Sequence, residues 1–324
     1  MYTYTQPMKT FRILSLDGGG LRGIFTCHVL NKLSYYLGEP LSSKFDLVIG
    51  TSTGSIIGGM ISSNIPTSKI LTLYKTLAKE VFVEDSNLVN RCLRHIGLRP
   101  KYDIDKLENL ILNKVGSHTL NELSSKYSAI AYDVKHDRPF FFKSWDKDMG
   151  SIRLCDVMCM SSACPTIFSG REFIYKGVQH LMVDGGLGVC NPIMIGITQG
   201  LKLGYSLNNI QIISIGTGEE PYEFTLKDIT EWGTLQWATK MTNILFSAND
   251  EVQTSVAKEI LDSDNVFRFQ VNLKNNPTGV VCPSSLASND SQVINSFIEL
   301  GSKYILLDDI NNQMSKIQTK WMNT

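Results

Sequence analysis

The chain has 324 residues, of which 43% are hydrophobic and 19% are charged, so its composition is that of an ordinary globular protein. Its 31 basic side chains are balanced by 31 acidic ones, which argues against a protein that binds nucleic-acid polymers through overall charge. Seven cysteines without CxxC spacing, and an N-terminus without the features of a signal peptide, predict a cytoplasmic protein with reduced thiols.

The first half of the chain alternates short apolar runs with helical patterns. In chain order we expect a strand at 12–16, a helix at 21–37, a strand at 47–50, a helix ending near 62, a helix after Pro66, a basic loop at 81–101 and a helix at 103–113. Residues 47–68 carry no charge and could be mistaken for a membrane span. Their glycines and hydroxyl side chains instead predict a buried strand, a turn and a packed helix.

The second half continues the alternation. We expect strands at 127–132 and 139–143, a helix at 154–161, a strand running into a glycine turn at 181–186, a helix from Pro192, a strand at 211–215 and a last strand at 266–271 in a mostly helical C-terminal part. Strands that alternate with helices are typical of an α/β fold with a mainly parallel sheet.

A GxSxG motif spans Gly50, Ser52 and Gly54. It stands between an apolar strand and a helix, where the two glycines permit a sharp turn that exposes the serine hydroxyl. The N-terminus of the following helix adds positive potential beside that hydroxyl. The motif therefore predicts that Ser52 is a nucleophile.

Three consecutive glycines, Gly18, Gly19 and Gly20, follow the first strand. A dinucleotide-binding turn would need an acidic residue at the end of the next strand, and that strand ends instead at the Ser52 turn. A turn without chemistry is a second reading. We favour an oxyanion hole, because backbone N–H groups without neighbouring side chains can approach a developing negative charge closely.

The partner of Ser52 is predicted to be Asp184, which ends a strand and is followed by Gly185 and Gly186. In an α/β-hydrolase the catalytic histidine follows the acid in the chain, but every histidine here precedes Asp184. The five histidines are His28, His95, His118, His136 and His180. A carboxylate within hydrogen-bond reach can accept the serine proton directly.

Together the motifs DGGGLRG, GTSTG and DGG resemble those of the patatin-like phospholipase family. The resemblance continues in order through SSACPTIF at 161–168, Asn191-Pro192 and SIGTG at 214–218, with a weaker echo at 265–271. It implies a three-layer patatin-like α/β fold with a catalytic core at 11–220 and a mostly helical part at 221–324 packed on the same domain.

The resemblance also implies the roles of single residues. Ser52 and Asp184 would form a catalytic dyad, the amides around Gly18, Gly19 and Gly20 the oxyanion hole, and Arg22 a support for that loop. No metal or other cofactor would be required. The chain departs from the family pattern at Ser55, Cys164 and Cys190, and Cys190 could alter hydrogen bonds near the Asp184 turn.

The expected activity is hydrolysis of fatty-acyl esters of membrane phospholipids, which makes the chain a carboxylic ester hydrolase that meets the membrane peripherally. A second hypothesis is a bacterial defence phospholipase that needs a cyclic nucleotide or a partner protein to become active. A third, an inactive lipid-binding module, is disfavoured because every catalytic position is filled.

Two segments are candidates for the contact with lipid. Residues 139–145 interleave aromatic side chains with lysine, although a buried strand is the favoured reading. A basic cluster could meet anionic headgroups, read a nucleotide phosphate or form a solvated surface; it consists of Arg91, Arg94, His95, Arg99 and Lys101.

Overall fold

A computed structural model describes residues 10–84, 87–221 and 224–322. Its strands are β1 (Phe11–Leu16), β2 (Leu47–Thr51), β3 (Lys126–Asp133), β4 (Arg138–Lys143), β5 (Arg171–Tyr175), β6 (Val178–Asp184), β7 (Ile210–Ile215) and β8 (Val266–Phe269). Its α-helices are α1 (Gly23–Leu37), α2 (Thr53–Ser62), α3 (Thr67–Val81), α4 (Leu88–His95), α5 (Ile104–Val115), α6 (Leu154–Ser161), α7 (Ile193–Lys202), α8 (Leu226–Glu231), α9 (Thr234–Ile260), α10 (Ser291–Tyr304) and α11 (Asp308–Met322).

One mixed sheet runs through the molecule in the order β5-β6-β3-β2-β1-β7-β8, with β4 paired to β3. Five adjacent strands of the sheet run parallel to one another, in the order β3, β2, β1, β7 and β8. At the β3 end, β4 and β6 each pair antiparallel with β3, and β5 pairs antiparallel with β6. The expected mainly parallel α/β sheet is confirmed. β8 extends the sheet formed by the first two thirds of the chain.

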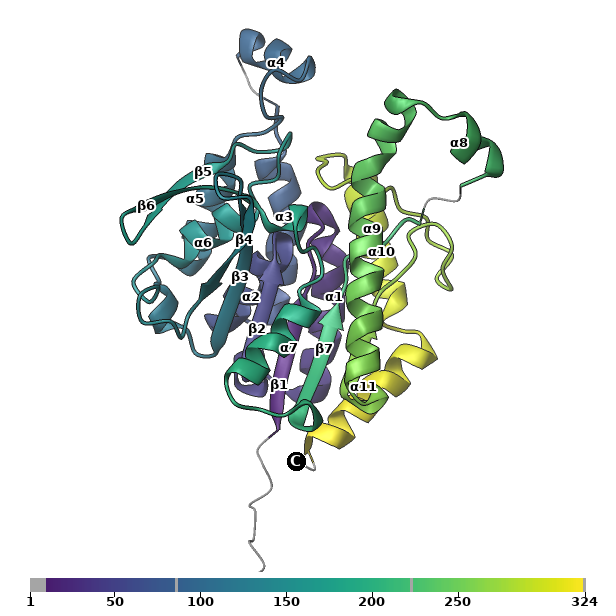
Figure 1. Cartoon of the computed structure of the whole chain (residues 1–324). Helices are drawn as coiled ribbons and strands as arrows, with labels where there is room; N and C mark the ends of the chain where they lie inside the picture. The colour runs from purple at the N-terminus through teal and green to yellow at the C-terminus, as the bar shows by residue number, and fades with distance from the viewer. Residues whose placement is uncertain (1–9, 85–86, 222–223, 323–324) are drawn as a thin grey trace, which may run out of the picture.

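Helices cover both faces of the sheet and give three layers. The side chains of β1 alternate between them: Phe11 and Ile13 pack with Ile193 and Ile197 of α7, while Leu14 and Leu16 face the larger cluster formed by α1, α2 and α3. Figure 1 shows α7 and α9 in front of the sheet and α1 and α2 behind it. α10 and α11 contact α1.

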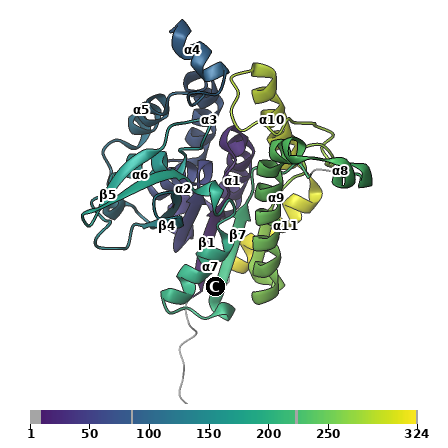
Figure 2. The same ribbon diagram turned by 45° about the horizontal axis from the view of Figure 1, so that its top comes forward.

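Three expectations from the sequence need comment. The predicted loop at 81–101 was wrong, because it contains α4, which projects from the body in both views (Figures 1 and 2). β5 was not expected at all. The segment 139–145 forms the predicted strand, since β4 pairs with β3, but of its residues only Phe142 is buried and the others are half-buried.

The uncharged stretch 47–68 forms β2, α2 and the start of α3, as expected. Among the described residues, no helix has the length and apolar character needed to cross a bilayer.

Candidate active site

β3 brings the ends of two other strands together. β2 pairs along β3 up to the pair Thr51–Ile130, and β6 pairs from the next residue, where Ala131 lies opposite Asp184. β4 occupies the opposite edge of β3, so β2 and β6 lie end to end along one edge. The carboxyl ends of both strands therefore meet, and Ser52, one residue beyond β2, is placed beside Asp184.

Ser52 sits on a sharp turn between β2 and α2. Its φ of 53° and ψ of −123° are rarely adopted by a residue other than glycine, and this strain is held by the packing around the turn. A Cβ atom on Gly50 would overlap the Gly54 carbonyl, and one on Gly54 would overlap the Leu16 carbonyl. Both glycines of the motif are therefore required by close backbone contacts.

The predicted dyad is in hydrogen-bond contact. Ser52 Oγ donates to Asp184 Oδ2 at 2.6 Å, and the amide of Gly186 donates to Asp184 Oδ1 at 2.7 Å. Burial raises the pKa of Asp184 to about 6, against the opposing effect of these two hydrogen bonds. A Cβ atom on Gly185 would overlap the Ile130 carbonyl, so this glycine permits the turn that follows Asp184.

Ser161 supports the turn at Ser52 and was not singled out from the sequence. The amide of Ser52 donates to Ser161 Oγ at 2.9 Å, and that hydroxyl donates to the Ile130 carbonyl at 2.5 Å. Ser161 is fully buried at the end of α6. It thereby ties the strained turn to β3, the strand that also positions Asp184.

The three glycines form a loop that faces Ser52, but their amides are not equivalent. The Gly18 amide donates to the Cys190 carbonyl at 3.0 Å, whereas the amides of Gly19 and Gly20 have no hydrogen-bond partner within the described part of the chain. The two amides free to donate a hydrogen bond into the pocket are therefore those of Gly19 and Gly20. Of the three amides predicted from the sequence as oxyanion-hole donors, the Gly18 amide is thus already occupied by another hydrogen bond.

The glycine loop is held from three sides. Thr217 Oγ1 donates to the Gly18 carbonyl at 2.9 Å, and Arg22 Nε approaches the Gly19 carbonyl at 3.4 Å. Gly20 has a φ of +57°, and a Cβ atom there would overlap the Leu286 carbonyl. The SIGTG segment thus acts as a support for the loop.

The three departures from the family pattern lie at different distances from the dyad. Cys190 contacts the glycine loop, with its Sγ 3.6 Å from the Gly18 carbonyl oxygen. Within the described ranges, the hydrogen bonds to the Asp184 carboxylate come from Ser52 and Gly186 and none comes from Cys190. Cys164 lines the pocket, where burial and the charge of Asp184 raise the pKa of its thiol to about 12. Ser55 donates to the Ser52 carbonyl inside α2.

A buried ion cluster behind the glycine loop was also missed in the sequence. Arg268 on β8 donates to Asp17 Oδ2 at 2.6 Å and to Asp250 Oδ1 at 2.7 Å, with all three side chains almost completely buried. Burial raises the pKa of Asp17 to about 7, while Arg268 acts in the opposite direction. Since Asp17 precedes Gly18, this cluster fixes the start of the loop from the C-terminal part of the chain.

A pocket with mostly apolar walls opens over the dyad. Besides the dyad and the glycine loop, its lining includes Ile56, Tyr74, Leu77, Phe82, Leu107, Ile167, Phe168 and Leu286. None of the five histidines, all of which lie in the described ranges, lines this pocket. His28 is buried between α1 and α10, where desolvation lowers its pKa to about 4.

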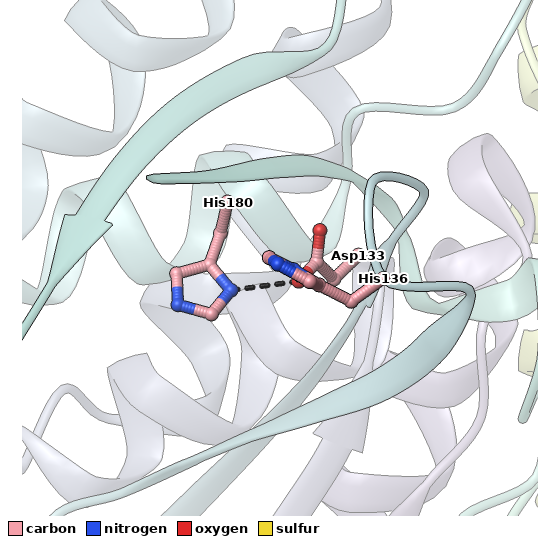
Figure 3. Close-up of side chains that lie close together, drawn as sticks. All are labelled: Asp133, His136 and His180. Atoms are coloured by element: carbon pink, nitrogen blue, oxygen red, sulfur yellow. Dashed lines mark hydrogen bonds and ion pairs between the residues drawn. The ribbon is translucent and has the colours of Figure 1, made fainter. Parts of the chain in front are cut away.

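A second group of titratable side chains lies near the outer end of β3 (Figure 3). His136 Nδ1 and His180 Nδ1 both contact Asp133 Oδ2, at 2.5 Å and 2.7 Å. Two ligand atoms bound to one tetrahedral zinc ion would lie about 3.3 Å from each other. Each histidine nitrogen is closer than that to the Asp133 oxygen, at the distance of a direct hydrogen bond. Burial opposes the ionised form of Asp133, but the bonds from His180 and His136 lower its pKa overall.

Comparison with solved structures shows a similar fold. VipD from Legionella pneumophila superposes with a TM-score of 0.51 at 12% sequence identity, covering 96% of this chain and 67% of that structure. At this identity the likeness concerns the fold alone.

Curated relatives are more similar in sequence. Calcium-independent phospholipase A2-gamma of Rattus norvegicus is 27% identical over 94% of this chain, and Patatin-like protein 2 of Arabidopsis thaliana is 27% identical over 70%. A cGAMP-activated phospholipase of Escherichia coli is 28% identical over 66%. The chain spans 40%, 65% and 64% of the lengths of these relatives, less than two thirds of each.

The family model for patatin-like phospholipases matches residues 14–197, which is more than half of the chain and includes the glycine loop, the GxSxG turn and the DGG turn. The chain therefore belongs to the patatin-like phospholipase family.

Proposed function

We propose that the chain is a lipid acyl hydrolase in which Ser52 is the nucleophile and Asp184 the general base. The observation that carries this proposal is the 2.6 Å hydrogen bond from Ser52 Oγ to Asp184 Oδ2 at the base of an apolar pocket. The strained turn presents the hydroxyl, and the buried carboxylate has a pKa near 6, so at neutral pH it is mostly ionised and able to accept a proton.

The proposed reaction has two steps. Asp184 takes the Ser52 proton as Oγ attacks the ester carbonyl, and the amides of Gly19 and Gly20 donate to the resulting oxyanion. When the tetrahedral adduct collapses, the ester C–O bond breaks and the leaving alcohol receives the proton from Asp184. A water molecule, deprotonated by the same carboxylate, then attacks the acyl-enzyme. As this second adduct collapses, the bond between the acyl carbon and Ser52 Oγ breaks, Asp184 returns the proton to Oγ, and the fatty acid is released.

The proposed substrate is a membrane phospholipid cleaved at an acyl ester. The apolar pocket walls suit an acyl chain, and several relatives carry phospholipase names. Such a substrate requires peripheral contact with a membrane surface. All seven cysteines are free thiols, which suits the cytoplasmic location expected from the sequence.

The dyad is tested by hydrolysis of a soluble monomeric ester and of phospholipid vesicles. We expect Ser52→Ala and Asp184→Asn to lower the rate by about 10³-fold or more, because each removes half of the nucleophile pair. Circular dichroism establishes that each variant is folded. A rate close to that of the unaltered chain in either folded variant would exclude the dyad.

A second candidate function is that of a phospholipase activated by a nucleotide or a partner protein. The likeness to the cGAMP-activated phospholipase of Escherichia coli supports it. Hydrolysis measured with and without a cyclic dinucleotide distinguishes the two functions. A rate that is high without any activator supports the constitutive enzyme, whereas a rate that appears only with the nucleotide supports the regulated one.

A further inference from the structure

α4 is an amphipathic helix whose apolar side is uncovered. Its first turn is capped by Asn87, whose Oδ1 accepts hydrogen bonds from the amides of Val89 and Asn90, so the segment has a defined helical start. Over an arc of about 100° the helix and its C-cap residue, Ile96, carry only apolar or thiol side chains, namely Leu88, Val89, Cys92 and Ile96.

The exposure of these side chains is unusual for an amphipathic helix in a folded domain. Leu88, Val89 and Ile96 are 69%, 67% and 62% exposed, and Leu98 just beyond the helix is 71% exposed. None of the described residues of α4 is buried. Because a helix of this pattern normally covers a core with its apolar side, the exposed side of α4 has the properties of an interaction surface.

The opposite side of α4 is basic and faces a hollow of about 810 Å³. The basic residues that line it are Arg91, Arg94, His95, Arg99 and Lys101. Residues 87–102 contain four Arg or Lys and no Asp or Glu, although the whole chain has no net charge. The segment is therefore locally basic, and the one acidic side chain among the described residues that line the hollow, Glu84, lies 3.9 Å from Arg91.

Two of these arginines are fixed by the local structure. Arg99 Nη1 donates to Asn90 Oδ1 at 2.8 Å, and Arg94 Nη1 donates to the Lys101 carbonyl at 3.2 Å. These bonds tie the segment after the helix back to α4. The basic side and the apolar side are thus held on opposite faces of one small unit.

The basic hollow adjoins the pocket of the candidate active site. Phe82 lines both cavities. Thr166 and Ala287 line the basic hollow, and their chain neighbours Ile167 and Leu286 line the pocket. Figure 1 shows α4 beyond the end of the sheet toward which β7 points, which is the end where the dyad lies.

We propose that α4 is a docking element for a lipid surface that contains anionic phospholipids. Its apolar side inserts at the level of the first acyl carbons, while its arginines remain at headgroup level and bind lipid phosphates. The contact places the mouth of the catalytic pocket against the lipid. This inference rests on the proposed phospholipid hydrolase function and names how the enzyme meets its substrate.

Binding is tested by co-sedimentation with vesicles of phosphatidylcholine, with and without about one third phosphatidylglycerol, using chain inactivated by Ser52→Ala so that the vesicles stay intact. We expect binding to the anionic vesicles that weakens in high salt. Arg91→Gln/Arg99→Gln should lower the partition coefficient by roughly 30-fold, since each basic side chain near an anionic surface contributes about 1 kcal/mol. Leu88→Asp/Ile96→Asp should abolish binding to the anionic vesicles.

Matched controls separate this element from general surface effects. Lys258→Gln/Lys316→Gln removes the same charge from the exposed surface of α9 and α11, and Leu306→Asp alters an apolar side chain that is 69% exposed. We expect both controls to bind vesicles like the parent. Equal binding by the α4 variants and the controls would overturn the proposal.

Two further measurements distinguish the possible failures. With Ser52 intact, the α4 variants should hydrolyse a soluble monomeric ester at the unaltered rate and vesicle lipid more slowly. If the intact chain hydrolyses neither, the proposed function fails, while the sedimentation result still decides on docking. Saturable binding of a cyclic dinucleotide that is lost in Arg91→Gln/Arg99→Gln, with vesicle binding unchanged, would assign the basic hollow to a soluble nucleotide and overturn the docking proposal.

Discussion

The proposed active site and the proposed docking helix α4 hold their side chains in opposite ways. Ser52 and Asp184 are 8% and 5% exposed, and each is held by a hydrogen bond: the Ser52 amide donates to the Ser161 hydroxyl, and the Gly186 amide donates to the Asp184 carboxylate. Leu88 in α4 and Ile96 at its C-cap are more than 60% exposed and contribute to no core. The difference follows from what each region must contact: covalent chemistry needs atoms fixed to within a fraction of an ångström, whereas contact with a fluid lipid surface needs accessible apolar area.

The largest effect on stability should come from the ion cluster behind the glycine loop. Arg268→Gln leaves the carboxylates of Asp17 and Asp250 buried without their cation, and we expect it to lower the free energy of unfolding by about 3–5 kcal/mol. Urea unfolding followed by circular dichroism measures this change.

A matched control uses an ion pair of similar geometry on the surface. Arg153→Gln breaks the contact with Asp156, in which the arginine side chain is 52% exposed, and should cost no more than about 1 kcal/mol. If the two variants lose the same stability, the buried cluster does not support the loop as described.

Two adjacent serines offer a sharper test of how the nucleophile turn is held. Ser161→Ala removes the partner of the Ser52 amide and of the Ile130 carbonyl, which should cost about 1–3 kcal/mol because both groups are buried. Ser162 is also buried, but its hydroxyl has no hydrogen-bond partner among the described residues, so Ser162→Ala should change the unfolding free energy by less than about 0.5 kcal/mol. A smaller cost for Ser161→Ala than for Ser162→Ala would contradict the hydrogen-bond scheme.

The pH dependence of hydrolysis reports on the burial of the base. Asp184 must be ionised to accept the proton, and its pKa is raised to about 6, so kcat/KM should be constant above pH 7 and fall tenfold per pH unit well below pH 6. An exposed aspartate would lose activity only near pH 4. The profile is measured with a soluble monomeric ester, and full activity at pH 5 would show that the carboxylate is solvated or is not the base.

The sequence predicted those parts of the site whose geometry is local. The turn at Ser52 follows from a strand, two glycines and a helix within sixteen residues, and Asp184 is recognisable because it ends a strand before two glycines. That the two meet depends on how β2 and β6 share one edge of β3, which the family resemblance implied but the local pattern did not contain.

The supporting residues could not be found in this way. Ser161 lies 109 residues from Ser52, and Arg268 lies 251 residues from Asp17, so their contacts depend on the register of the whole sheet. The arginine inside the apolar run of β8 was the available signal, because an arginine buried among apolar side chains needs an acidic partner. α4 was missed because a helix of eight residues, followed by Gly97 and Pro100, has the composition of a loop.

The smallest effect should be the stability change on α4 itself. Leu88→Asp/Ile96→Asp alters two large apolar side chains, yet we expect the free energy of unfolding to change by no more than about 0.5 kcal/mol, because neither side chain is buried against the rest of the chain. Leu33→Ala in α1 provides the contrast, since that side chain is fully buried and its truncation should cost about 2–5 kcal/mol. A loss above about 2 kcal/mol in the α4 variant would mean that the apolar side is covered by the chain in solution, and a covered side could not meet lipid without first opening.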